Sequence, residues 1–60
     1  MKMLKLNRED GVQFWVNPEH IVGLENIAPN VCGILLSTNI IKKAAKTAEE
    51  VVTDIESLDD

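Results

Sequence analysis

The sequence is short of the residues that usually hold small proteins together. Its 60 residues include one cysteine and one histidine. One cysteine excludes an internal disulfide, and one Cys with one His cannot supply the four ligands of a usual structural zinc site. A domain of this length buries only about 60% of the surface that its unfolded chain exposes. Close packing or a second copy must therefore stabilise the fold, and we expect a homo-oligomer.

Long apolar runs are also missing. No stretch approaches the ~20 apolar residues that a membrane helix requires. The first residues, M-K-M-L-K-L-N-R-E-D, lack the apolar segment of an export signal. Together with the single cysteine, these features predict a cytoplasmic protein that does not enter a membrane.

Catalytic motifs are absent as well. The sequence has no glycine-rich phosphate loop, no nucleophile elbow and no recognisable pair of catalytic carboxylates. We therefore expect no enzyme, no catalytic residue, no cofactor and no metal. Cys32 lies in an apolar run, where a small buried side chain is expected. His20 follows Pro18 and Glu19 in a predicted turn, where a simple hydrogen bond is its usual role.

Charge is unevenly distributed along the chain. The net charge is -4, and residues 49–60 carry acidic charges only. This acidity argues against nucleic acid as a partner, because it repels phosphate backbones. An alternative hypothesis is a small nucleic-acid-binding regulator, for which the candidate contacts are Arg8, Lys42, Lys43 and Lys46. The other interpretation of these lysines is a charged edge strand that resists aggregation.

What the sequence does contain is a series of short strand patterns. Strands are predicted over residues 3–6, 12–16, 21–25, 31–38 and 40–45. Asp10-Gly11 predicts a tight hairpin turn, and Asn39 permits another. Residues 26–30 are predicted as a loop around the second proline. Gly33 is expected to mark a bulge or the close approach of another backbone.

A helix is predicted over residues 48–58. Thr47 and Glu50 fit a capping box, in which each side chain accepts a hydrogen bond from the backbone N–H of the other. One apolar stripe follows, made of Ala48, Val51, Val52, Ile55 and Leu58. The chain is therefore expected to be one α+β domain over residues 1–60, with a small antiparallel β-sheet of four to five strands packed on one C-terminal α-helix.

Phe14 and Trp15 are the two aromatic residues, and they are adjacent. On an extended backbone they point to opposite faces, so one of them must leave the core. If Phe14 takes the core, Trp15 lies outside with Gln13 and Asn17, and we expect these three to contact a protein partner or a second copy. The alternatives are that Trp15 is the core residue, or that the loop near Pro29 covers it.

Several stretches occur in the same order in a known family. They are K-L-N-R-E-D-G-V-Q-F-W-V-N-P-E-H-I, I-V-G-L-E-N, A-P-N-V, G-I-L-L-S-T-N and T-A-E-E-V-V-T-D-I. In this order they resemble the FlbD family of small proteins encoded with bacterial flagellar genes. That family usually has Asn-Gly in its last hairpin, whereas here Ile40 follows Asn39, so the geometry of this hairpin stays open. The resemblance implies a small cytoplasmic, non-enzymatic accessory protein linked to flagella. A prophage-encoded relative would show the same pattern.

Overall fold

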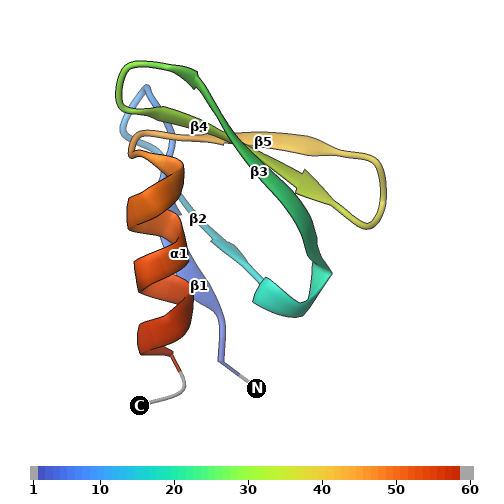
Figure 1. The fold of residues 1–60 in the computed structure, drawn as a ribbon. Helices are drawn as coiled ribbons and strands as arrows, with labels where there is room; N and C mark the ends of the chain where they lie inside the picture. The colour runs from blue at the N-terminus through green and yellow to red at the C-terminus, as the bar shows by residue number, and fades with distance from the viewer. Residues whose placement is uncertain (1, 59–60) are drawn as a thin grey trace.

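A computed structural model describes residues 2–58, and within them the chain forms five strands and one α-helix. The elements in order are β1 (Leu4–Asn7), β2 (Gln13–Val16), the 3-10 helix η1 (Pro18–His20), β3 (Ile21–Ala28), β4 (Val31–Leu36), β5 (Ile41–Ala44) and α1 (Ala48–Ser57) (Figure 1). The predicted α+β class is confirmed, as are the antiparallel strands and the C-terminal helix.

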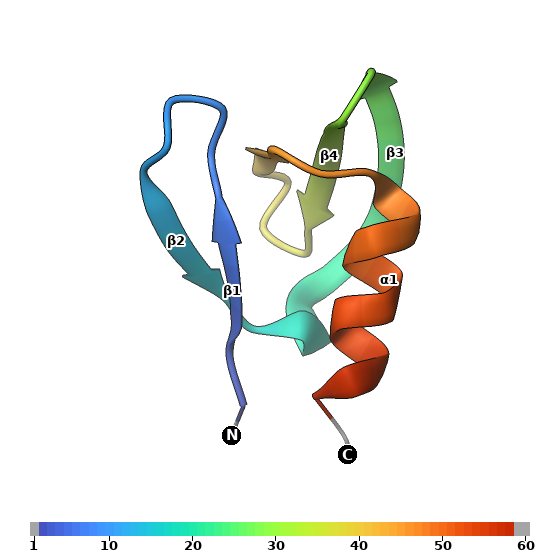
Figure 2. The ribbon, with the colours of Figure 1, turned by 90° about the vertical axis from the view of Figure 1, so that its left-hand side faces the viewer.

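The strands form two sheets, so the prediction of a single sheet of four to five strands is wrong. β1 and β2 make a two-stranded ribbon, and β3, β4 and β5 make a three-stranded sheet with β4 in the centre. The ribbon and the larger sheet lie on opposite sides of the core (Figure 2). A backbone hydrogen bond from Ala45 N–H to the Asn7 carbonyl, 2.8 Å long, connects the end of the second sheet to the ribbon.

The separation of the sheets has its cause between β2 and β3. Asn17 caps η1, because its side-chain oxygen accepts a hydrogen bond of 3.0 Å from the Glu19 N–H. Pro18 has no N–H with which to continue a strand ladder, and its fixed φ favours the start of a helical turn. The chain therefore turns away after β2 instead of pairing β3 beside it.

The turns predicted from glycine and asparagine are confirmed. Gly11 has φ 87° and Asn39 has φ 65°, both in the left-handed region that these residues tolerate best. The last hairpin, which the sequence leaves open, is closed by two backbone hydrogen bonds of 2.9 Å, from Asn39 N–H to the Leu36 carbonyl and from Leu36 N–H to the Ile40 carbonyl. Asn-Gly is thus not required there, because Asn39 adopts the positive φ itself.

The predicted loop over residues 26–30 is correct for residues 29–30 and wrong for residues 26–28. β3 continues to Ala28, and the turn consists of Pro29 and Asn30, with Asn30 at φ 59°. The pairing of β3 with β4 shifts register twice, once near each end of β3. Such shifts bend a strand and allow a long strand to curl around a small core.

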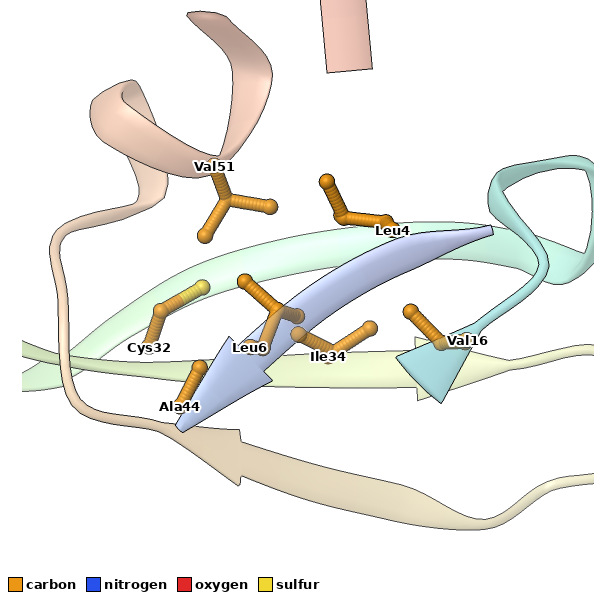
Figure 3. Close-up of a cluster of buried hydrophobic side chains, with 7 residues drawn as sticks. All are labelled: Leu4, Leu6, Val16, Cys32, Ile34, Ala44 and Val51. Carbon is orange, nitrogen blue, oxygen red and sulfur yellow. The ribbon is translucent and has the colours of Figure 1, made fainter. Parts of the chain in front are cut away.

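The core lies between the ribbon, the three-stranded sheet and α1. Each of these layers contributes at least one buried side chain to the core, as Figure 3 shows. The buried side chains are those of Leu4, Leu6, Val16, Cys32, Ile34, Ala44 and Val51. β1 alternates between buried and exposed residues, and β4 turns Cys32 and Ile34 into this cluster, as expected for strands with one face on the core. The fold therefore depends on apolar burial from all three layers.

The capping box of α1 is confirmed. Thr47 Oγ1 accepts the Glu50 N–H at 3.1 Å, and Glu50 Oε1 accepts the Thr47 N–H at 3.0 Å. The Thr47 N–H and the Thr47 hydroxyl both donate to Glu50 Oε1, which favours the ionised carboxylate and lowers the pKa of Glu50. The predicted apolar stripe is wrong at one position: Val51 is buried, but Val52 remains 44% exposed. The buried stripe of α1 is thus narrower than the sequence pattern suggests.

Candidate interaction site

The outer side of the β1–β2 ribbon is the first candidate surface. Leu6 pairs with Phe14, and Lys5 pairs with Trp15, so the two aromatic residues belong to opposite faces. Phe14 packs against the core, while Trp15 is 57% exposed. The open choice between the two aromatic residues is therefore settled: Phe14 faces inward. Gln13 lies beside Trp15 on the outer side, and we call this surface the ribbon face.

Trp15 has one partner within the ribbon face. The Lys5 ammonium lies 6.0 Å from the centre of the Trp15 ring, a cation–π contact across the strand pair. Asn17 follows the same alternation, but its side chain caps η1. The structure thus brings Gln13 and Trp15 together on one surface and gives Asn17 a role in shaping the turn that ends it.

The outer side of the three-stranded sheet is a second surface, which sequence reasoning missed. Its side chains follow two rows across the strands. The first row is Gly23, Leu35 and Ile41, and the second row is Glu25, Gly33 and Lys43. We call this surface the outer sheet face. It is apolar in its first row, with Ile41 64% exposed, and it carries opposite charges at the two ends of its second row.

Two glycines hollow this face. A shallow depression of about 390 Å³ lies over Gly23 and Gly33. A Cβ on Gly33 would lie 3.6 Å from Ile27 Cγ2 and 3.8 Å from Ile41 Cγ2, so both isoleucines lean over this glycine. The expected bulge at Gly33 is therefore wrong, since the register shifts belong to β3 and side chains, not another backbone, approach it. Glycine inside an apolar strand was the signal that could have pointed to this hollow.

The basic residues of the nucleic-acid hypothesis are dispersed. Lys42 pairs across from Ile34 and Lys43 from Gly33, so their side chains leave β5 on opposite faces. Lys46 forms an ion pair with Asp54.

Arg8 is likewise engaged by a carboxylate. It forms an ion pair with Asp10, which raises the pKa of Arg8 and lowers the pKa of Asp10. Arg8 does share a shallow hollow with Lys43, but Glu9 and Asp10 line the same hollow. The four bases therefore do not form one uninterrupted positive patch of the kind that tracks a phosphate backbone.

His20 and Cys32 have the structural roles expected of them. His20 Nδ1 lies 3.1 Å from Ser37 Oγ, and the Ser37 N–H donates to the His20 carbonyl at 2.8 Å, so the histidine ties η1 to the end of β4. Cys32 is fully buried, and burial raises the pKa of its thiol. Within residues 2–58, no three His, Cys, Asp or Glu side chains are grouped so as to hold a metal ion. The same residues include no helix with the length and apolarity needed to cross a membrane.

Fold and surfaces together define a small α+β protein with two exposed sheet faces, one aromatic and one apolar. Comparison of the chain with protein-family models, with curated proteins and with solved structures finds no match. The resemblance to the FlbD family therefore stays a prediction, and the two faces are the features from which a function can be inferred.

Proposed function

We propose that the chain is a small cytoplasmic, non-enzymatic protein-interaction module that binds through its sheet faces and forms homo-oligomers. The observation that carries this proposal is that paired strands in both sheets turn large apolar side chains outward, with Trp15 57% and Ile41 64% exposed. The backbone of paired strands is already ordered, so a partner that covers these side chains need not order the backbone as well.

The ribbon face supplies the contact for a partner protein. Tryptophan is enriched among the residues that dominate binding energy, and a polar rim around such a residue is typical of interfaces. Lys5 and Gln13 provide that rim on either side of Trp15. Asn17 supports the face by holding the turn at the end of β2.

The FlbD resemblance supports a biological setting for this module. It favours a flagellar accessory protein, with a prophage-encoded relative as the alternative. Deleting the gene and measuring flagellar assembly and swimming tests the setting. Loss of motility supports the flagellar proposal, whereas normal flagella and normal swimming contradict it.

Solution mass over a range of concentrations tests the proposed self-association. We expect light scattering to give a mass above that of one chain, and a mass of one chain at every concentration contradicts homo-oligomer formation. Trp15 is the only tryptophan, so its fluorescence reports on the ribbon face in the same samples. Emission that stays at the wavelength of an exposed indole during assembly shows that the ribbon face remains open to a different protein.

A further inference from the structure

We propose that the outer sheet face binds the same face of a second copy, in a dimer whose two-fold axis runs parallel to β4. The proposal depends on the proposed function only in that the chain self-associates.

The symmetry follows from the order of the strands. β4 is central, with β3 and β5 at the edges of the sheet. A two-fold rotation about an axis parallel to β4, placed just above the face, exchanges the two edges but keeps each position along the strands. β3 of one copy then lies over β5 of the other, and each row of side chains faces the same row of its partner. Such isologous contacts require a self-complementary surface.

The first row is complementary in size. Ile41 projects from β5, and Gly23 on β3 has no side chain, so Ile41 of each copy faces Gly23 of the other. Leu35 on β4 meets Leu35 of the second copy near the axis. A large residue opposite a small one at both edges lets two sheets interdigitate at their usual separation of about 10 Å.

The second row is complementary in charge. Glu25 on β3 faces Lys43 of the second copy, and Lys43 on β5 faces Glu25 of the second copy. Gly33 lies between them at the axis, beneath Ile27 and Ile41. Within residues 2–58, ion pairs form between Arg8 and Asp10 and between Lys46 and Asp54, which leaves Glu25 and Lys43 for pairing between copies.

These two rows favour a second copy over an unrelated partner. Opposite charges at opposite edges, combined with a knob at one edge and a hollow at the other, match the same surface after a two-fold rotation. An unrelated protein would require no such relation between β3 and β5. A chain of 60 residues gains little stability from its own core. Burying the outer sheet face in a dimer adds to that stability.

Charge reversal on β3 and β5 tests the dimer. In Lys43→Glu the two cross-copy ion pairs become contacts between acids, and in Glu25→Lys they become contacts between bases. We expect each single variant to raise the dimer Kd by about tenfold or more. Sedimentation measures the Kd, and circular dichroism checks the fold, which both changes should leave intact because both side chains are exposed.

An equimolar mixture of the two single variants provides the decisive measurement. One variant then supplies two acids and the other two bases, so we expect a heterodimer as tight as the wild-type dimer. The double variant Glu25→Lys/Lys43→Glu should also dimerise like the wild type. Lys42→Glu is the matched control, since its side chain leaves the same strand on the opposite face and should not change the Kd.

Each of the following results overturns the proposed dimer. Single variants that dimerise as tightly as the wild type, or a mixture that stays monomeric, contradict the pairing of Glu25 with Lys43 across the interface. If assembly survives both reversals but is lost in a folded Trp15→Ala variant, the ribbon face self-associates; this dimer is then wrong, although the proposed function stands. A wild type that is monomeric throughout contradicts this dimer and the proposed self-association, whereas binding of a different protein to the ribbon face is tested separately.

Discussion

Asn26 on β3 holds the N-terminus of α1. Its side-chain oxygen accepts the Ala48 N–H at 2.8 Å, and its amide donates to the Glu49 carboxylate, also at 2.8 Å. The first N–H groups of a helix have no partner within the helix, so this side chain satisfies one of them from a neighbouring strand. The contact joins the helix directly to the sheet whose outer side we propose as the dimer interface.

Replacing Asn26 with alanine should therefore loosen the helix. We expect Asn26→Ala to lower the free energy of unfolding by about 1 kcal/mol, the usual effect of losing a capping hydrogen bond. Urea denaturation followed by circular dichroism measures the change. Asn7→Ala, at an exposed site on β1, is the control and should change stability by less than about 0.5 kcal/mol. Equal effects of the two substitutions would argue against the anchoring role of Asn26.

Val51 and Val52 form a matched pair on α1. Val51 is fully buried and Val52 is 44% exposed, although the two are adjacent and identical. We expect Val51→Ala to cost about 2 kcal/mol, because it removes buried methyl groups and leaves a cavity. Val52→Ala should cost less than about 0.5 kcal/mol. Chemical denaturation of both variants measures the difference. A larger loss of stability in Val52→Ala than in Val51→Ala would show that Val52, and not Val51, faces the core.

The capping box makes stability depend on pH. Thr47 lowers the pKa of Glu50 in the folded chain below its ordinary value of 4.5. The unfolded state therefore binds a proton more readily, so this contribution to stability is present above pH 4.5 and is lost as the pH falls through the folded pKa. We expect Glu50→Gln to flatten the acid side of the stability profile. Thermal unfolding from pH 3 to pH 7 measures it, and an unchanged acid slope would contradict the prediction.

Alanine substitutions at Gly23 and at Gly11 distinguish an effect on dimerisation from an effect on folding. A Cβ on Gly23 would lie 3.8 Å from the Leu35 side chain, an ordinary contact, so Gly23→Ala should fold while partly filling the hollow that receives Ile41. We expect a weaker dimer and an intact monomer. Gly11→Ala should do the reverse. Gly11 has φ 87°, a conformation in which any side chain is strained, so the substitution should cost about 1 kcal/mol of stability. Gly11 lies outside the proposed interface. Sedimentation and urea denaturation, applied to both variants, distinguish the two effects.

Trp15 tests whether the ribbon face binds a different protein. A photo-crosslinking amino acid at position 15 should capture a partner, whereas the same amino acid at the exposed helix position Thr53 should not. The captured protein is then purified, and its affinity for the wild type and for Trp15→Ala is compared. We expect a loss of at least about tenfold in the variant, as is usual when an interface tryptophan is removed. Equal affinities, or identical capture at both positions, would contradict the role of Trp15.

Local chemistry in the sequence predicts much of this fold. Gly11 and Asn39 identify their turns because few residues adopt positive φ, and Thr47 with Glu50 identifies the helix start because the capping box is contained within four residues. The division into two sheets is not local: Pro18 shows where β2 ends but not where β3 pairs.

The candidate surfaces show the same limit. Adjacency places Phe14 and Trp15 on opposite faces, yet only the core formed by the other elements decides which one is buried. The outer sheet face depends on the register of β3 against β4, which shifts twice. Its rows could therefore not be aligned from hydrophobic periodicity, and Gly33 was the one residue whose oddity in an apolar strand pointed there.

The complete burial of Cys32 gives the protein a built-in reporter of its own opening. A thiol reagent cannot reach this sulfur until β4 parts from the helix and the ribbon, so the labelling rate follows transient opening, not the intrinsic chemistry of the thiol. Since no other cysteine is present, the signal comes from one site. If the second copy stabilises the fold, labelling of Cys32 slows as the protein concentration rises. The labelling rate at this one thiol then measures how strongly dimer formation stabilises the chain.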